Sequence, residues 1–107
     1  MDAFETDALI QEQATRESPY LEFLRVPALN MGLYVLPARS EDAQHPHDED
    51  EVYYIVEGRA IIAVDGEDRP VQACSIVYVA AHVEHRFHHI SDDLKVLVFF
   101  AAAPTEA

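Results

Sequence analysis

The sequence predicts an all-β domain, a sandwich or barrel preceded by a short N-terminal arm or helix. Three observations predict this class. β-Branched and aromatic residues gather in short runs, turn signals such as Asp65-Gly66 separate these runs, and only the first residues have a helix-like pattern. About eight closely spaced strands without a helix between them are typical of sandwiches and barrels.

The chain is expected to divide into an N-terminal arm over 1–19 and a barrel over 20–103. Its 107 residues are the length of one ordinary domain, and half of them are apolar, which is enough for a core. Ser18-Pro19 marks the boundary, because proline ends a helix and opens a turn.

The arm is predicted to be helical over residues 2–16. Asp2 followed by Glu5 resembles a capping box. Phe4, Ala8 and Gln11 would share one face of this helix. The apolar stripe is thin, so a frayed or irregular arm is the alternative interpretation.

The runs after the arm predict eight strands in order. They are expected at 20–26, 30–37, 51–58, 59–65, 69–73, 75–80, 85–90 and 94–101. Glu57-Gly58 and Ser91-Asp92-Asp93 are read as turns between strands, and Asp65-Gly66 is a two-residue hairpin signal.

Composition excludes some classes of partner. The formal net charge is -13, which disfavours nucleic acid and anionic membranes because both attract basic surfaces. The single cysteine, Cys74, allows no intramolecular disulfide, and the N-terminus lacks the positive charge of a secretory signal. The longest apolar run is too short to span a bilayer, so a cytoplasmic protein is expected.

Polar residues at strand parity predict a metal site. His45, His47 and Glu51 are spaced to share one strand face, because alternate residues of a strand point the same way. A further ligand must come from a distant segment, and His85 is the candidate. Imidazole nitrogens with one carboxylate suit divalent transition metals. The alternative interpretation is scattered surface histidines near an acidic loop.

The same parity suggests residues around such a site. The candidates for a pocket wall or for contacts with the ligands are Tyr34, Tyr53, Phe87 and His89. His89 shares parity with His85, whereas ordinary barrel core is the alternative for the aromatic residues. Asp48, Glu49 and Asp50 are read as a solvated acidic loop.

The stretch from His45 to Gly58 resembles the first motif of the cupin superfamily. That motif runs His-x-His, three residues, Glu, six residues, Gly, and His45, His47, Glu51 and Gly58 match it position by position. In the second motif His85 falls on the ligand histidine. The chain therefore resembles a small single-domain cupin of the conserved-barrel type.

The second motif departs from the family pattern at its turn residues. Cys74 replaces the first glycine, Ala80 the proline, His82 the second glycine and His89 the asparagine, and Ala38-Arg39 stands where the first motif begins with glycine. If the turns keep their shape, Cys74 and His82 must adopt a left-handed backbone conformation, which costs strain.

The resemblance implies an antiparallel jelly-roll barrel, the double-stranded β-helix, with one divalent metal held by His45, His47, Glu51 and His85. The ion would be Fe, Mn, Zn, Ni or Cu, since these ligands do not select one. The resemblance also implies a small-molecule ligand or substrate and a homodimer. Two functions follow: a metalloenzyme of the dioxygenase, isomerase or decarboxylase type, or a non-catalytic metal or small-ligand binding module or sensor. A metal that only holds the fold together is a third, weaker hypothesis.

Overall fold

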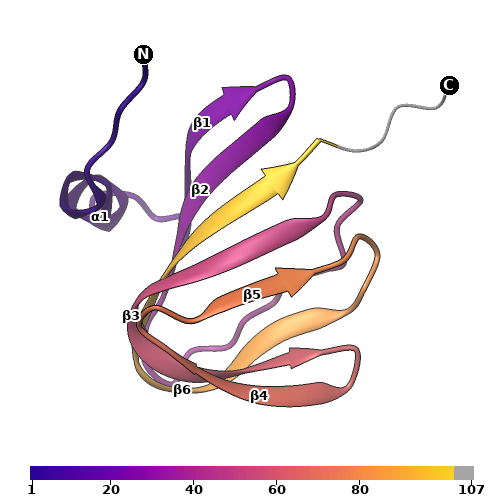
Figure 1. Cartoon of the computed structure of the whole chain (residues 1–107). Coiled ribbons are helices and arrows are strands. Elements are labelled where there is room, and N and C mark those ends of the chain that lie inside the picture. The colour runs from indigo at the N-terminus through magenta and orange to yellow at the C-terminus, as the bar shows by residue number, and fades with distance from the viewer. Residues whose placement is uncertain (103–107) are drawn as a thin grey trace, which may run out of the picture.

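The structure is a computed structural model that describes residues 1–102, and it confirms an all-β architecture with one short helix (Figure 1). The helix is α1 (Thr6–Ala14). The strands are β1 (Tyr20–Val26), β2 (Leu29–Leu36), β3 (Glu51–Val64), β4 (Glu67–Gln72), β5 (Ile76–Val79) and β6 (His85–Ala101). They form an antiparallel sheet in the order β1-β2-β6-β3-β4. The remaining strand, β5, also pairs with β3.

Six strands form where eight were expected, because β3 and β6 each run through a predicted turn. The prediction of turns at Glu57-Gly58 and at Ser91-Asp92-Asp93 is wrong. The register between β3 and β6 shifts between Ile55 and Ile61, which marks β-bulges. Gly58 has φ +104° there, and an added Cβ would lie 2.8 Å from the Leu94 Cα. Glycine therefore bends a continuous strand and does not end it.

This bend lets each long strand serve both halves of the barrel. The first half of β3 pairs with β5 and with the end of β6, where Glu51 lies opposite Val79 and Phe100. Its second half pairs with β4 and with the start of β6, where Val64 lies opposite His85. The first residues of β3 and of β6 are therefore not paired with each other, and they can approach across the interior of the barrel.

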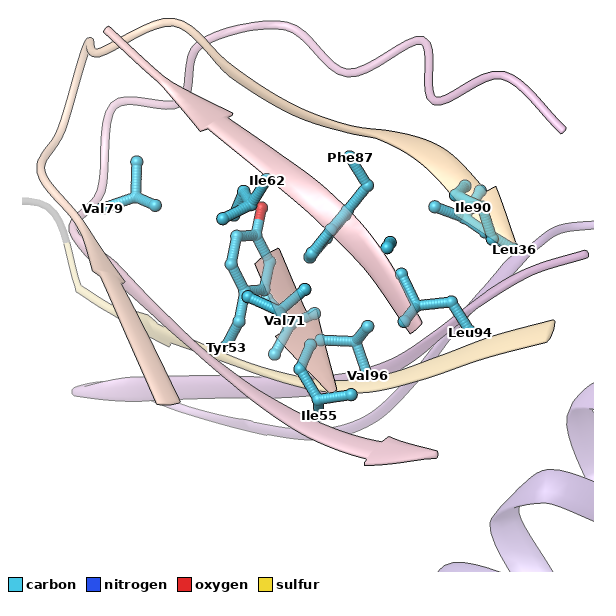
Figure 2. Packing of buried hydrophobic residues seen from close by; sticks show 12 residues of the cluster. Leu36, Tyr53, Ile55, Ile62, Val71, Val79, Phe87, Ile90, Leu94 and Val96 are labelled. Atoms are coloured by element: carbon cyan, nitrogen blue, oxygen red, sulfur yellow. The ribbon is translucent and has the colours of Figure 1, made fainter. Parts of the chain in front are cut away.

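The core fills the space between the two halves. Figure 2 shows aliphatic and aromatic side chains pointing into it, with the Tyr53 hydroxyl as the only oxygen among the sticks. Tyr53, Ile55, Phe87, Leu94 and Val96 are completely buried. A full core of this kind provides a rigid frame for a site at one end of the barrel.

Helix α1 lies outside the barrel, beside β1 and β2 (Figure 1). It buries Leu9 against Leu21 and Leu33. Phe4 precedes the helix and lies against the Phe23 ring of β1, and Ala8 and Gln11 are exposed, so these three residues do not form one helix face as predicted.

The predicted capping box is wrong too. The N-cap is Glu5, it makes no side-chain cap hydrogen bond, and the helix begins at Thr6 and not near Asp2. This later start makes Leu9 the inward residue. No helix in the described part of the chain is long and apolar enough to cross a membrane.

The backbone has a left-handed conformation at the turns where the cupin motifs have glycine and this chain does not. Asp65-Gly66 forms the predicted two-residue hairpin turn, with φ of 50° and 81° between the paired Val64 and Glu67. Arg39, Cys74 and His82 have φ of 67°, 75° and 67°. Non-glycine residues therefore hold left-handed positions at the substituted turns, at a cost of about 1 kcal/mol each.

Candidate metal centre

Three potential ligands lie together at one end of the barrel. The ligand atoms of His47, Glu51 and His85 are all within 4.8 Å of one another. Only 2% of Glu51 and 6% of His85 is exposed, and His47 is half-buried. Within residues 1–102 this is the one cluster of at least three such residues with metal-site spacing.

Glu51 and His85 owe their meeting to the bend in the long strands. Glu51 is the first residue of β3 and His85 the first of β6. In the ladder they lie at opposite ends of the paired strands, yet the His85 Nε2 is 2.7 Å from the Glu51 Oε1. The two halves of the barrel therefore bring these side chains together from opposite walls.

His47 lies on the segment 37–50, which is irregular and contains no strand. Its carbonyl accepts a hydrogen bond of 2.7 Å from the His82 N–H. Its ring centroid lies 5.4 Å from that of His85 and 5.1 Å from that of Phe100. Asp50, predicted to be a solvated loop residue, accepts a 2.8 Å hydrogen bond from the Ala81 N–H through its side chain and so fastens the segment.

The hydrogen bonds around His85 fix its tautomer, and as a result its Nε2 faces two oxygen acceptors, from Glu51 and Gln44. The Val83 carbonyl lies 2.8 Å from the His85 Nδ1, and a carbonyl can only accept, so Nδ1 carries a hydrogen. In the neutral ring Nε2 is then an acceptor, and it faces the Glu51 Oε1 and, at 3.2 Å, the Gln44 Oε1. The Tyr53 hydroxyl lies 2.9 Å from each of these oxygens and has one proton to donate.

This arrangement fits a cation. The Glu51 Oε2 is buried and has no hydrogen-bond partner within residues 1–102, which is costly for a carboxylate. Burial lowers the pKa of His85, but hydrogen bonds to Glu51 and Val83 and the charges of Glu51 and Asp42 outweigh it, so the pKa is raised. The site thus attracts positive charge, either a proton on His85 or a metal ion.

His45 does not join this group. Its side chain is exposed and lines a second cavity, whose wall also contains Gln44, His85 and Arg86, but it is not among the residues whose ligand atoms lie within 4.8 Å of one another. The parity that linked His45 to Glu51 requires an extended strand, and the intervening residues form none.

A cavity of about 340 Å³ opens beside the cluster and is lined by one of its members, His47, and by Gln44, whose Oε1 contacts His85. Its other lining residues are Tyr20, Glu22, Arg25, Asn30, Tyr34, Glu49, Val98 and Phe100. The cavity has an apolar side and a polar side, which is typical of sites for small organic molecules.

The predicted neighbours of the site divide into three groups. Tyr34 lines the cavity. Tyr53 and Phe87 are core residues, although the Tyr53 hydroxyl reaches Glu51 and the Phe87 N–H donates to Asp42. His89 is exposed and contacts His88, away from the cluster, because its φ of 49° breaks the strand alternation and Ile90 turns inward instead.

Sequence reasoning missed several residues that surround the cluster. Asp42 and Gln44 precede the motif on an irregular segment, where periodicity carries no signal. Arg25 lines the cavity from β1 in a two-point ion pair with Glu22, with distances of 2.6 and 2.9 Å. The run of strand residues over 20–26 predicted β1, but it did not predict that Arg25 of this strand lines the cavity.

Comparison with known proteins gives a consistent assignment. A family model described as "Cupin domain" matches residues 32–100. The uncharacterized protein SCO3923 of Streptomyces coelicolor is 50% identical over 101 residues, which cover 94% of this chain and 96% of that protein.

Two solved structures show the same fold. A cupin protein from Bacteroides fragilis has a TM-score of 0.70 at 22% identity, covering 86% of this chain and 83% of that one. The DMSP lyase DddQ from Ruegeria pomeroyi has a TM-score of 0.69 at 20% identity, covering 77% of this chain and 42% of that one.

Proposed function

The chain belongs to the cupin domain family and has its jelly-roll barrel, and we propose that it is a small metalloenzyme. It would bind one divalent transition metal through His47, Glu51 and His85 and act on a small organic molecule. One observation carries the proposal: the ligand cluster adjoins, through His47, a cavity of about 340 Å³, so a bound ion would lie beside a space that can hold a substrate.

The donor set narrows the chemistry. Two imidazoles with one carboxylate and open positions are typical of oxygen-activating non-haem Fe(II) sites. The same donors also bind Mn, Zn, Ni and Cu, where the ion supplies Lewis-acid chemistry for isomerases or decarboxylases. Iron with dioxygenase chemistry is the form that this set favours. A lyase among the structural neighbours supports the view that this barrel accommodates catalysis.

The chain's own residues bind and orient the substrate. Burial, with the charges of Glu22 and Glu51, raises the pKa of Tyr20 to about 12, and burial with the hydrogen bond to Asp42 raises the pKa of Tyr34. Both hydroxyls therefore stay protonated at neutral pH. Val98 and Phe100 exclude water from one side of the cavity.

A homodimer is proposed as the working form. The outer face of β3 carries Val52 and Tyr54, which pair with Tyr78 and Ile76 of β5. Ile76 and Tyr78 are 70% and 60% exposed, an uncommon state for large apolar side chains. A second copy packed on this face would cover them, and light scattering of wild type and Tyr78→Lys tests it: the variant should become monomeric.

The function is tested by metal content and turnover. Freshly purified protein is analysed for Fe, Mn, Zn, Ni and Cu, and the loaded protein is assayed for oxygen consumption with catechols, thiols and small keto acids. His47→Ala and Glu51→Gln should lose both metal and turnover. His88→Ala is the matched control, because His88 lies on β6 outside the cluster and pairs with Asp68. Metal retained by both site variants would contradict the proposal.

A non-catalytic binding module is the second candidate. It is favoured by one observation: Glu22 in the cavity wall is already paired with Arg25, and Tyr20 and Tyr34 are protonated, which leaves Glu49 as the carboxylate of the wall that could act as a base. Tight ligand binding to the metal-loaded protein without turnover would support this module over the enzyme.

A further inference from the structure

We propose that Gln44, and not His45, is the fourth protein ligand of the ion, and that Asp42 is the residue that positions it. This inference rests on the proposed metal site at His47, Glu51 and His85 and completes its ligand set. It assigns a metal-binding role to a residue outside the His-x-His motif.

The first support is the direction of the Gln44 side chain. Its Oε1 lies 3.2 Å from the His85 Nε2 and 2.9 Å from the Tyr53 hydroxyl. The Tyr53 hydroxyl is also 2.9 Å from the Glu51 Oε1, so both oxygens approach the same point. The Tyr53 hydroxyl has one proton for these two oxygens, so a further proton on His85 or a cation is needed to satisfy both of them.

The second support is the way the amide is held. The Gln44 Nε2 donates a 2.6 Å hydrogen bond to the Asp42 Oδ2, so the nitrogen end is committed and the oxygen end must face the cluster. The same Oδ2 accepts a 2.8 Å hydrogen bond from the buried Phe87 N–H, and the Tyr34 hydroxyl donates to the other oxygen at 2.5 Å. Only 6% of Asp42 is exposed. A carboxylate fixed by three donors on two strands and the segment is a rigid support.

The third support is the placement of His45. Gln44 is half-buried and His47 is half-buried, whereas His45 and Pro46 between them are exposed. Gln44 and His47 are thus the less exposed residues of this stretch, and the exposed His45 lines a cavity whose wall also contains Gln44 and His85 without joining the group of ligand atoms within 4.8 Å of one another.

The ligand set has a consequence for metal preference. Two imidazole nitrogens with a carboxylate and an amide oxygen are harder donors than three imidazoles with a carboxylate. Harder oxygen donors shift preference toward Mn and Fe and away from Cu. The Gln44 assignment therefore agrees with the iron site proposed above.

The test compares two neighbouring substitutions in the full-length protein. Zn²⁺ and Mn²⁺ affinities are measured by calorimetry for wild type, Gln44→Ala and His45→Ala, with thermal melting of the metal-free proteins as the check on folding. Gln44→Ala should weaken binding of either ion about 10- to 100-fold. His45→Ala should remain within about 2-fold of wild type, because an exposed side chain outside the ligand set is removed.

Counting bound histidines gives a readout independent of affinity. In Co²⁺-loaded protein, proton NMR should show shifted imidazole N–H signals from two histidines, and both should persist in His45→Ala. Asp42→Asn should weaken Mn²⁺ binding through Gln44, while the double variant Asp42→Asn, Gln44→Ala should be no weaker than Gln44→Ala alone. Non-additivity of this kind identifies Asp42 as a positioning residue.

The overturning results are separate from those of the proposed function. A third imidazole signal that disappears in His45→Ala, or a loss of affinity in that variant, would overturn the assignment of Gln44 while leaving a metal site. Wild-type protein that binds none of these ions would overturn the metal site and this inference together.

Discussion

The two halves of the candidate metal centre are held in place by different interactions. Glu51 and His85 begin the two longest strands, where backbone pairing fixes which way each side chain points. Asp42, Gln44 and His47 lie on the irregular segment 37–50, which is fastened by hydrogen bonds of individual side chains and turns. A ladder tolerates the loss of one side chain, whereas such a segment does not. Changes of the backbone in the first half should therefore act mainly on stability, whereas loss of a single side chain in the second half should both destabilise the segment and weaken metal binding.

The largest effect is expected at the bend that brings the strand-held ligands together. Gly58→Ala should lower the free energy of unfolding by about 3 kcal/mol, because φ is +104° and the new Cβ would clash with the Asp93 carbonyl and the Leu94 Cα. Chemical denaturation measures the change. Gly66→Ala is the matched control, also at positive φ but with open space around it, and should cost about 1 kcal/mol. Equal losses in the two variants would show that the bend is not a packed contact.

The next effect is expected on the segment. Asp42→Ala should cost about 2 kcal/mol, since it leaves the buried Phe87 N–H without its acceptor. It should also weaken Mn²⁺ binding about 10-fold or more, because Gln44 loses its support. Denaturation and calorimetry measure the two quantities. Asp50→Ala, which releases the Ala81 N–H at an exposed position, should cost about 1 kcal/mol. An Asp42→Ala variant with unchanged affinity would contradict the division between the two halves.

A smaller effect of opposite sign is expected at the strained turns. Arg39→Gly and Cys74→Gly should each raise the free energy of unfolding by about 1 kcal/mol, because glycine adopts their φ of 67° and 75° without strain. Thermal and chemical denaturation check the gain. Arg39→Ala keeps the strain and is the control. Destabilised glycine variants would indicate that these side chains make contacts more important than the strain.

The smallest effect concerns pH. The folded pKa of Tyr20 is raised from 10.0 to about 12, so its contribution to stability is complete below pH 10 and is lost as pH rises through about 12. Tyr20→Phe should make the alkaline loss of stability shallower and should cost little at pH 7, since the buried hydroxyl has no partner within residues 1–102. Denaturation at several pH values from 8 to 12 measures this. An unchanged alkaline slope would mean that the phenol is not buried in solution.

The sequence predicted what depends on periodicity. β1 has the expected bounds, the Asp65-Gly66 hairpin is confirmed, and the barrel class follows from alternating strands. Continuous strands through Gly58 and Ser91-Asp92-Asp93 could not be foreseen, because the same residues mark bulges and turns, and only long-range pairing distinguishes them.

The candidate site shows the same limit. Glu51 and His85 sit at strand starts, where parity applies, and the structure brings them together with His47. His45 shared the parity argument but lies on an irregular segment where it does not apply. Asp42 and Gln44 act through hydrogen bonds to distant strands, and no local pattern encodes such partners.

The central place of β6 also sets the order in which the chain can fold. β6 lies between β2 and β3, and Ala101 pairs with Leu29, so most of the chain separates these partners. On the ribosome, β2 and β3 are synthesised before β6, so the strand edges that later pair with β6 stay unpaired until it emerges. Closing so long a loop before any contact forms is slow, and the exposed edge of β3, a strand rich in valine and isoleucine, invites mispairing between nascent chains. Expression at low temperature, or with chaperones, should therefore increase the soluble yield.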